Sequence, residues 1–152
     1  MEKLLNLLTE LESKVPNSEK LDLSISKSPV GWHIEHTLMT TIQIIEALEN
    51  SNPQDYKWKF NLPKVFIYAI NKIPRGRGKA PKSVQPKGAI VTDNLKKNIL
   101  VAKMKVKELT NLDSNNYFEH PYFGKLNLKP TIRFLKIHTK HHIEIINDII
   151  KG

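Results

Sequence analysis

Apolar residues recur every three or four positions along most of this chain, and this spacing restricts the fold more than any other feature. Such spacing places the apolar side chains on one face of an α-helix. It predicts amphipathic helices over residues 1–15, 28–49, 92–109 and 128–151. No alternation of apolar and polar residues is long enough to predict a strand. We expect one all-α domain spanning residues 1–152, folded as a four-helix bundle.

Local signals mark where these helices begin. Ser28 can act as an N-cap, and Pro29 suits the first helical position because its missing N–H needs no partner there. Thr92 has the same capping chemistry at the start of the third long helix. An extra short helix is predicted after Pro63, where residues 65–70 are apolar on all sides. A helix of that kind is expected to be buried.

Positive charge is concentrated in one part of the chain. The formal net charge is +9, and residues 72–107 contain eleven basic residues and one acidic residue. Residues 75–90 combine this charge with glycine and proline, which predicts an exposed basic loop without a buried core. Arg75, Arg77 and Lys79 are therefore candidates for binding an anion such as a phosphate or an acidic substrate. The alternative is a solvated face of a lysine-rich protein. Nucleic-acid binding is disfavoured because no aromatic residues are interspersed for base stacking.

Other classes of protein are excluded by what the sequence lacks. It has no cysteine, which excludes disulfide scaffolds, thiolate zinc fingers and cysteine nucleophiles. Its first segment lacks the unbroken apolar core of a signal peptide. No stretch approaches the roughly eighteen uninterrupted apolar residues of a membrane span. We therefore expect a cytoplasmic protein with no membrane partner, in which any transition-metal site is built from histidines and carboxylates.

Two of the six histidines form a candidate ligand pair. His138 and His142 stand four residues apart on the last predicted helix, so both rings project from one face. Imidazoles at this spacing can share a metal ion. The alternative is that one or both rings hydrogen-bond to a carbonyl or a water in the core. The residues that share this face predict that it points into the bundle: Thr131, Phe134, Leu135, Ile145 and Ile149.

A third ligand would come from the second predicted helix. His36 lies there on an uncharged stripe of mixed polarity, together with Trp32, Thr40 and Gln43. Such a mixture is typical of a pocket wall. A separate face of the same helix is wholly apolar and is expected in the core: Ile34, Leu38, Ile45 and Leu48.

Two further histidines lie beside the candidate ligands in the sequence. His33, at the fringe of the stripe, is a candidate hydrogen-bonding neighbour, and His141 is expected behind the ligands or on the surface. Together, His36, His138 and His142 would provide three neutral ligands and leave a coordination position open. That arrangement is typical of catalytic rather than structural zinc sites.

Three segments of the chain resemble the DinB/YfiT-like superfamily, in the branch with His-Pro-x-Phe-Gly-x-Leu and His-x-x-His-His motifs. These segments are residues 28–36 (SPVGWHIEH), 120–126 (HPYFGKL) and 138–142 (HTKHH). The resemblance implies a four-helix bundle that binds a divalent metal, zinc or nickel, through His36, His138 and His142. Some relatives are transferases or isomerases that use a low-molecular-weight thiol, others are hydrolases, and many are dimers. A small-molecule substrate, a thiol cosubstrate and a homodimer are therefore implied here.

Two functions from different classes remain open. The first is a metal-dependent enzyme of the DinB-like type, a thiol transferase or a hydrolase, in which the metal activates water or a thiol. The second is a metal-free helical binding module for an anionic ligand or a protein partner. His120 also has two interpretations, as a polar pocket residue near the metal or as the first residue of a tight Pro-Tyr-Phe-Gly turn.

Overall fold

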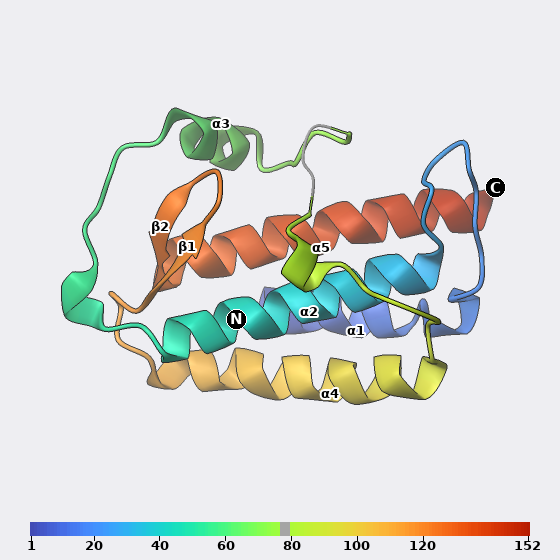
Figure 1. The fold of residues 1–152 in the computed structure, drawn as a ribbon, viewed down its shortest axis with the longest axis horizontal. Coiled ribbons are helices and arrows are strands. Elements are labelled where there is room, and N and C mark those ends of the chain that lie inside the picture. The colour runs from blue at the N-terminus through green and yellow to red at the C-terminus, as the bar shows by residue number, and fades with distance from the viewer. Residues whose placement is uncertain (77–79) are drawn as a thin grey trace.

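The computed structural model describes residues 1–76 and 80–152, and these residues form a mainly helical fold. Four long helices are α1 (Glu2–Glu12), α2 (Val30–Glu49), α4 (Thr92–Glu108) and α5 (Leu128–Lys151), and a short helix is α3 (Leu62–Ile70). Two strands, β1 (Tyr117–His120) and β2 (Gly124–Asn127), precede α5. The helical prediction is therefore confirmed in its main elements, with ends that differ by a few residues (Figure 1).

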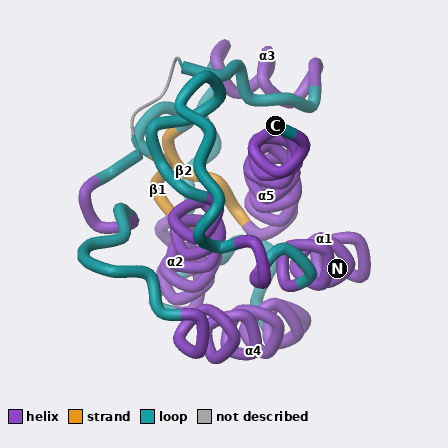
Figure 2. Tube along the Cα trace, turned by 90° about the vertical axis from the view of Figure 1, so that its right-hand side faces the viewer, coloured by secondary structure: helices purple, strands orange, loops and turns teal. Residues whose placement is uncertain are grey.

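The four long helices pack side by side around one core. In this arrangement α2 contacts α4 and α5, and α1 contacts the same two helices from the other side (Figure 2). Each buried aliphatic side chain stabilises the fold by roughly 1.5–3 kcal/mol relative to exposure. The apolar face predicted for α2 is fully buried: Ile34, Leu38, Ile45 and Leu48.

The first helical turns do not use the side-chain caps that the sequence indicates. Helix α2 begins at Val30 with Pro29 as its N-cap, and α4 has Val91 rather than Thr92 in that position. In α2 the leading amides are satisfied by an earlier loop, since Val30 N–H donates to the Lys20 carbonyl and Gly31 N–H to that of Ser18. A tertiary contact thus replaces the local cap.

The prediction that the chain contains no strand is wrong. Strands β1 and β2 form an antiparallel hairpin in which His120 pairs with Gly124, and Gly124 takes a positive φ of 67° that suits glycine. Each strand has only four residues, which is too short for a readable alternation. The hairpin inserts the buried side chains of Phe118 and Leu126 into the core.

The composition of helix α3 predicts that it is buried, but most of its side chains are exposed. It lies outside the ring of long helices (Figure 2), and Leu62 and Phe66 are 66% and 57% exposed. Only one side of the helix is covered, where Ile67 and Tyr68 pack against the core. Residues 65–70 of α3 are apolar on all sides of the helix. Among the described residues, however, nothing packs on its outer side, so the side chains there stay exposed to water.

The segment after α3 corrects another expectation. Its composition predicts an exposed loop without buried residues, yet Val84 is buried in a 3-10 turn over Lys82–Val84 that contacts α2. None of the helices in the described ranges is both long enough and apolar enough to cross a membrane.

Candidate metal centre

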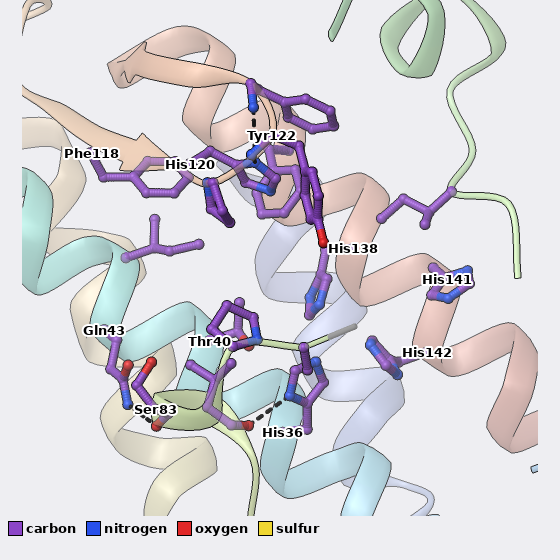
Figure 3. A pocket seen from close by; sticks show the side chains of 18 of the residues that line it. His36, Thr40, Gln43, Ser83, Phe118, His120, Tyr122, His138, His141 and His142 are labelled. Atoms are coloured by element: carbon purple, nitrogen blue, oxygen red, sulfur yellow. Dashed lines mark hydrogen bonds between the residues drawn. The ribbon is translucent and has the colours of Figure 1, made fainter. Parts of the chain in front are cut away.

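Three buried histidines from two helices converge at the centre of the fold. His36 comes from α2, and His138 and His142 come from successive turns of α5. One ring nitrogen from each lies within 4.8 Å of the others. Their ring centroids are 4.6–5.2 Å apart, and the three rings meet edge to face where α2 and α5 approach each other (Figure 3).

The orientation of His36 is fixed by the 3-10 turn that follows α3. Its Nδ1–H donates to the carbonyl oxygen of Val84 at 2.7 Å. This hydrogen bond places the proton on Nδ1 and leaves Nε2 with its lone pair. His36 therefore has the tautomer that a metal ligand needs.

His142 is oriented by a second histidine. Its Nδ1 lies 3.1 Å from Nδ1 of His33, and Nε2 of His33 lies 2.9 Å from Oγ of Ser26. The chain of contacts runs from the loop before α2 to the buried cluster. With Nδ1 of His142 engaged in this way, Nε2 is the nitrogen left for a ligand bond.

The ring of His138 has a nitrogen that the described part of the chain leaves without a partner. Its Nδ1 is buried and has no hydrogen-bond partner among the described residues. A buried polar atom without a partner costs about 1–3 kcal/mol. Three imidazole nitrogens are also a donor set that suits zinc or nickel. The residues present therefore fit a divalent transition metal.

Burial keeps these rings neutral. Desolvation lowers the pKa of His138 and His142 well below the ordinary 6.5, and adjacent histidines lower it further. Desolvation also lowers the pKa of His36, although its bond to Val84 opposes the shift, and lowers that of His33 to about 4. Neutral imidazole is the ligand form, so at neutral pH no proton has to be displaced.

A cavity of about 500 Å³ opens beside the cluster. Among the predicted pocket residues, Trp32, Thr40, Gln43, His120 and His141 line it together with the three ligand candidates. The ring of Trp32 stacks on that of His36 at 5.1 Å, and Gln43 donates to the Ser83 carbonyl. His33 is not in the lining, because it lies behind His142.

His120 combines both of its predicted interpretations. It lines the cavity, and its Nδ1 accepts the backbone N–H groups of Tyr122 and Phe123 in the hairpin turn. Its ring stacks on Phe123 at a centroid distance of 4.1 Å and meets the edge of Phe134 at 4.7 Å. The hairpin, which the periodicity did not predict, is what brings this residue to the cavity.

The predicted anion-binding set is not assembled in the described residues. Arg75 donates to the carboxylate of Asp148 on α5 at 2.8 Å, and both side chains are exposed. Arg77 and Lys79 lie outside the described residues.

Several residues of the site were not found by sequence reasoning. Val84 and Ser26 act through contacts that depend on loop conformation, and no local pattern marks them. Phe118 and Phe123 also line the cavity, beside Phe134, which the periodicity places on the face of the candidate ligands. Phe123 belongs to the motif at residues 120–126, which is the available signal for it.

No family model, curated protein or solved structure matches this chain. The function is therefore inferred from the geometry and chemistry of the cluster.

Proposed function

We propose that this protein is a metal-dependent enzyme of the DinB/YfiT-like type, in which His36, His138 and His142 hold one divalent cation, zinc or nickel. The observation that carries the proposal is the convergence of three buried neutral imidazoles, one nitrogen of each within 4.8 Å of the others, at the wall of a cavity. The packing of four long helices around this cluster supports the bundle type.

At such a centre, some residues would bind the cation and others would hold the ligand rings in place. Val84 and His33 fix the rings of His36 and His142, so that the ligand nitrogens are held before the cation arrives. A divalent cation held by these three residues would keep a coordination position open, and it would lower the pKa of a bound water or thiol towards neutrality. This chemistry would suit a hydrolase or thiol-transferase reaction on a small molecule.

Metal content tests the proposal. The protein is purified without a His-tag or chelator, and zinc and nickel are measured by plasma mass spectrometry in the wild type and in His138→Ala. We expect nearly one metal per chain in the wild type and loss in the variant. His141→Ala is the matched control, because His141 lies on the same helix and lines the same cavity without belonging to the three-histidine cluster.

Thermal unfolding gives a second readout. A cation that binds only the folded chain stabilises it by about 2.7 kcal/mol at a hundred times its dissociation constant. We expect added zinc to raise the unfolding temperature of the wild type and of His141→Ala, but not that of His138→Ala. A wild type that contains no metal and takes up neither zinc nor nickel would contradict the proposal and favour the metal-free binding module.

A further inference from the structure

The walls of the cavity are of two kinds. One part carries the candidate ligands of α2 and α5, with Thr40, Gln43 and Ser83 as further polar groups (Figure 3), whereas most of the remaining lining is aromatic or aliphatic. One charged side chain, that of the exposed Glu119, is among the described lining residues. Among the described lining residues a cationic body has only the exposed Glu119 as a partner and an anionic body has none, while an apolar body would be desolvated favourably. The apolar part of the lining includes Ile44, Ile67, Ile73, Phe118, Phe123 and Phe134.

His120 supplies a fixed hydrogen-bond donor within this apolar wall. Because its Nδ1 accepts two backbone N–H groups, the proton of the neutral ring is on Nε2. No residue in the described ranges hydrogen-bonds to that Nε2–H. Desolvation lowers the pKa of His120 to about 4, so the ring stays neutral at physiological pH. Stacking on Phe123 holds the plane of the ring.

The donor of His120 and the metal cluster are linked by one side chain of the cavity wall. The ring centroid of Phe134 is 4.7 Å from that of His120 and 5.6 Å from that of His138. A bound molecule that reaches both points therefore has a metal-binding group at one end and an acceptor at the other. The wall between these ends contacts its apolar body.

We propose that the cavity takes a small molecule with an uncharged apolar body, a metal-binding head group, and a carbonyl or hydroxyl oxygen that accepts from Nε2–H of His120. The metal-binding end of this inference rests on the proposed function; the apolar body and the His120 contact do not. The proposed molecule differs from the acidic substrate that the basic composition of residues 75–90 predicts.

Hydroxamic acids with one metal-binding group and different bodies are suitable probes. Binding to the zinc-loaded wild type is measured by isothermal titration calorimetry. Benzohydroxamic acid is expected to bind at least ~10-fold more tightly than acetohydroxamic acid, because its phenyl ring is desolvated in the cavity. It should also bind more tightly than the monohydroxamate of succinic acid, whose second end is charged. Equal affinities for the three would overturn the apolar-body assignment.

The His120 contact is tested with a para-acetyl substituent on benzohydroxamic acid. We expect this acceptor to improve affinity by about 2- to 10-fold in the wild type and not in His120→Asn. Asparagine keeps an oxygen that can accept the backbone N–H groups of the turn, so the hairpin is preserved. An equal gain from the acetyl group in His120→Asn would overturn the donor role.

An experiment without metal separates this inference from the proposed function. Acetophenone has the ring and the carbonyl but no metal-binding group, and its binding to chelator-treated protein is followed by saturation-transfer NMR. Saturation transfer that is strong in the wild type and weakened in His120→Asn supports the inference even if zinc does not bind. No transfer to acetophenone in the wild type would overturn it while leaving the metal site intact.

Discussion

Nδ1 of His33 and Nδ1 of His142 lie 3.1 Å apart, so one ring must donate a proton to the other. If His142 presents its Nε2 to the cluster, its own Nδ1 carries the proton and His33 accepts it. Nε2 of His33 is then protonated and donates to Oγ of Ser26. A chain of hydrogen bonds that begins at Ser26, in the loop before α2, thus sets the tautomer of the candidate ligand His142.

Removing His33 should weaken metal binding without abolishing it. In His33→Ala the ring of His142 loses the partner that orients it, and changes of this kind typically cost 10–100-fold in metal affinity. Zinc affinity is measured by competition with a chromophoric chelator, with the fold checked by circular dichroism. Ser26→Ala, one step further from the cluster, should have a smaller effect. An unchanged affinity in His33→Ala would show that His142 is held by its own packing.

Local periodicity was sufficient to predict the long helices and the residues that face the site. His138 and His142 could be selected because they lie on a face whose neighbours are apolar, and His36 because it lies on an uncharged stripe typical of a pocket wall. The faces of α2 were correctly separated, since Ile34 and Leu38 are fully buried while Thr40 lines the cavity. These properties depend on positions within one helix.

The contact of Val84 with His36, the hairpin and the exposure of α3 depend on contacts between elements, which periodicity does not encode. Val84 reaches His36 because a loop folds back on α2, and the composition of that loop indicates only exposure. The hairpin is set by pairing across a short turn at Gly124. Helix α3 is apolar on all sides but has one neighbouring layer, so its burial could not be inferred from its own residues.

Gly31 occupies a position in α2 where a side chain does not fit. A Cβ there would lie 2.7 Å from Cγ2 of Ile90 and 3.1 Å from the backbone oxygen of Ser18, to which Gly31 N–H donates. Gly31→Ala should therefore lower the free energy of unfolding by about 1–2 kcal/mol, since overpacking outweighs the better helix propensity of alanine. The measurement is the midpoint of urea unfolding. Lys97→Ala on the exposed face of α4 is the control, and a Gly31→Ala protein as stable as the wild type would mean that Ile90 moves aside.

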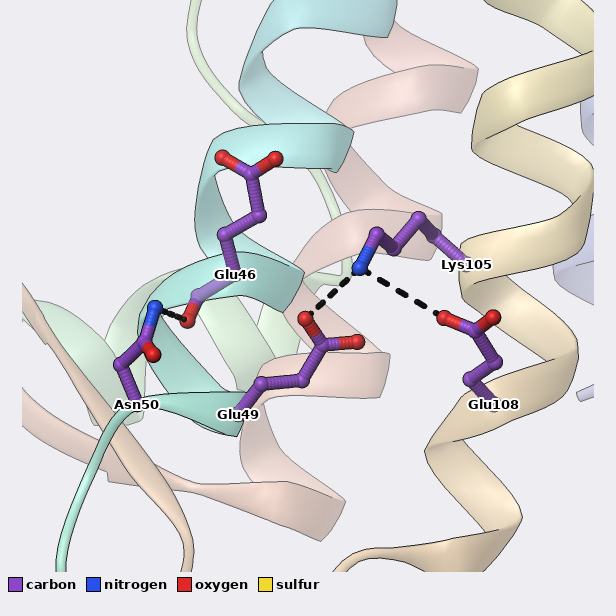
Figure 4. A network of polar contacts seen from close by, with 5 residues as sticks. All are labelled: Glu46, Glu49, Asn50, Lys105 and Glu108. Atoms are coloured by element: carbon purple, nitrogen blue, oxygen red, sulfur yellow. Dashed lines mark hydrogen bonds and ion pairs between the residues drawn. The ribbon is translucent and has the colours of Figure 1, made fainter.

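Lys105 joins α2 to α4 through two carboxylates. Its Nζ lies 2.8 Å from Glu49 on α2 and 3.5 Å from Glu108 on α4 (Figure 4). The hydrogen bond to Glu49 raises the pKa of Lys105 above its ordinary value. Lys105→Met keeps the apolar stem and removes the charge, so we expect a small loss of stability that shrinks as sodium chloride is added. Lys97→Met should show no such salt dependence, and a loss in Lys105→Met that is independent of salt would point to packing instead.

His120 should make the metal-free protein less stable in mild acid. Desolvation lowers its pKa from 6.5 to about 4 in the folded protein. As the pH falls from about 6.5 to 4, the unfolded chain binds a proton at this position that the folded chain excludes. The free energy of unfolding therefore decreases over this window, by up to about 1.4 kcal/mol per pH unit for this one group. Above pH 6.5 the contribution is constant, because both states are then neutral.

The variant His120→Asn isolates this contribution from that of the other buried histidines. Asparagine does not titrate in this range and keeps an acceptor for the turn. The curve of unfolding free energy against pH, measured with urea in the presence of a chelator, should be less steep for His120→Asn between pH 6.5 and 4. The other five histidines remain in both proteins, so the difference between the curves reports His120 together with its lowering effect on the pKa of His138. Parallel curves would mean that His120 is protonated equally in the folded and unfolded states, and its ring would then be open to water rather than enclosed by Phe123 and Phe134.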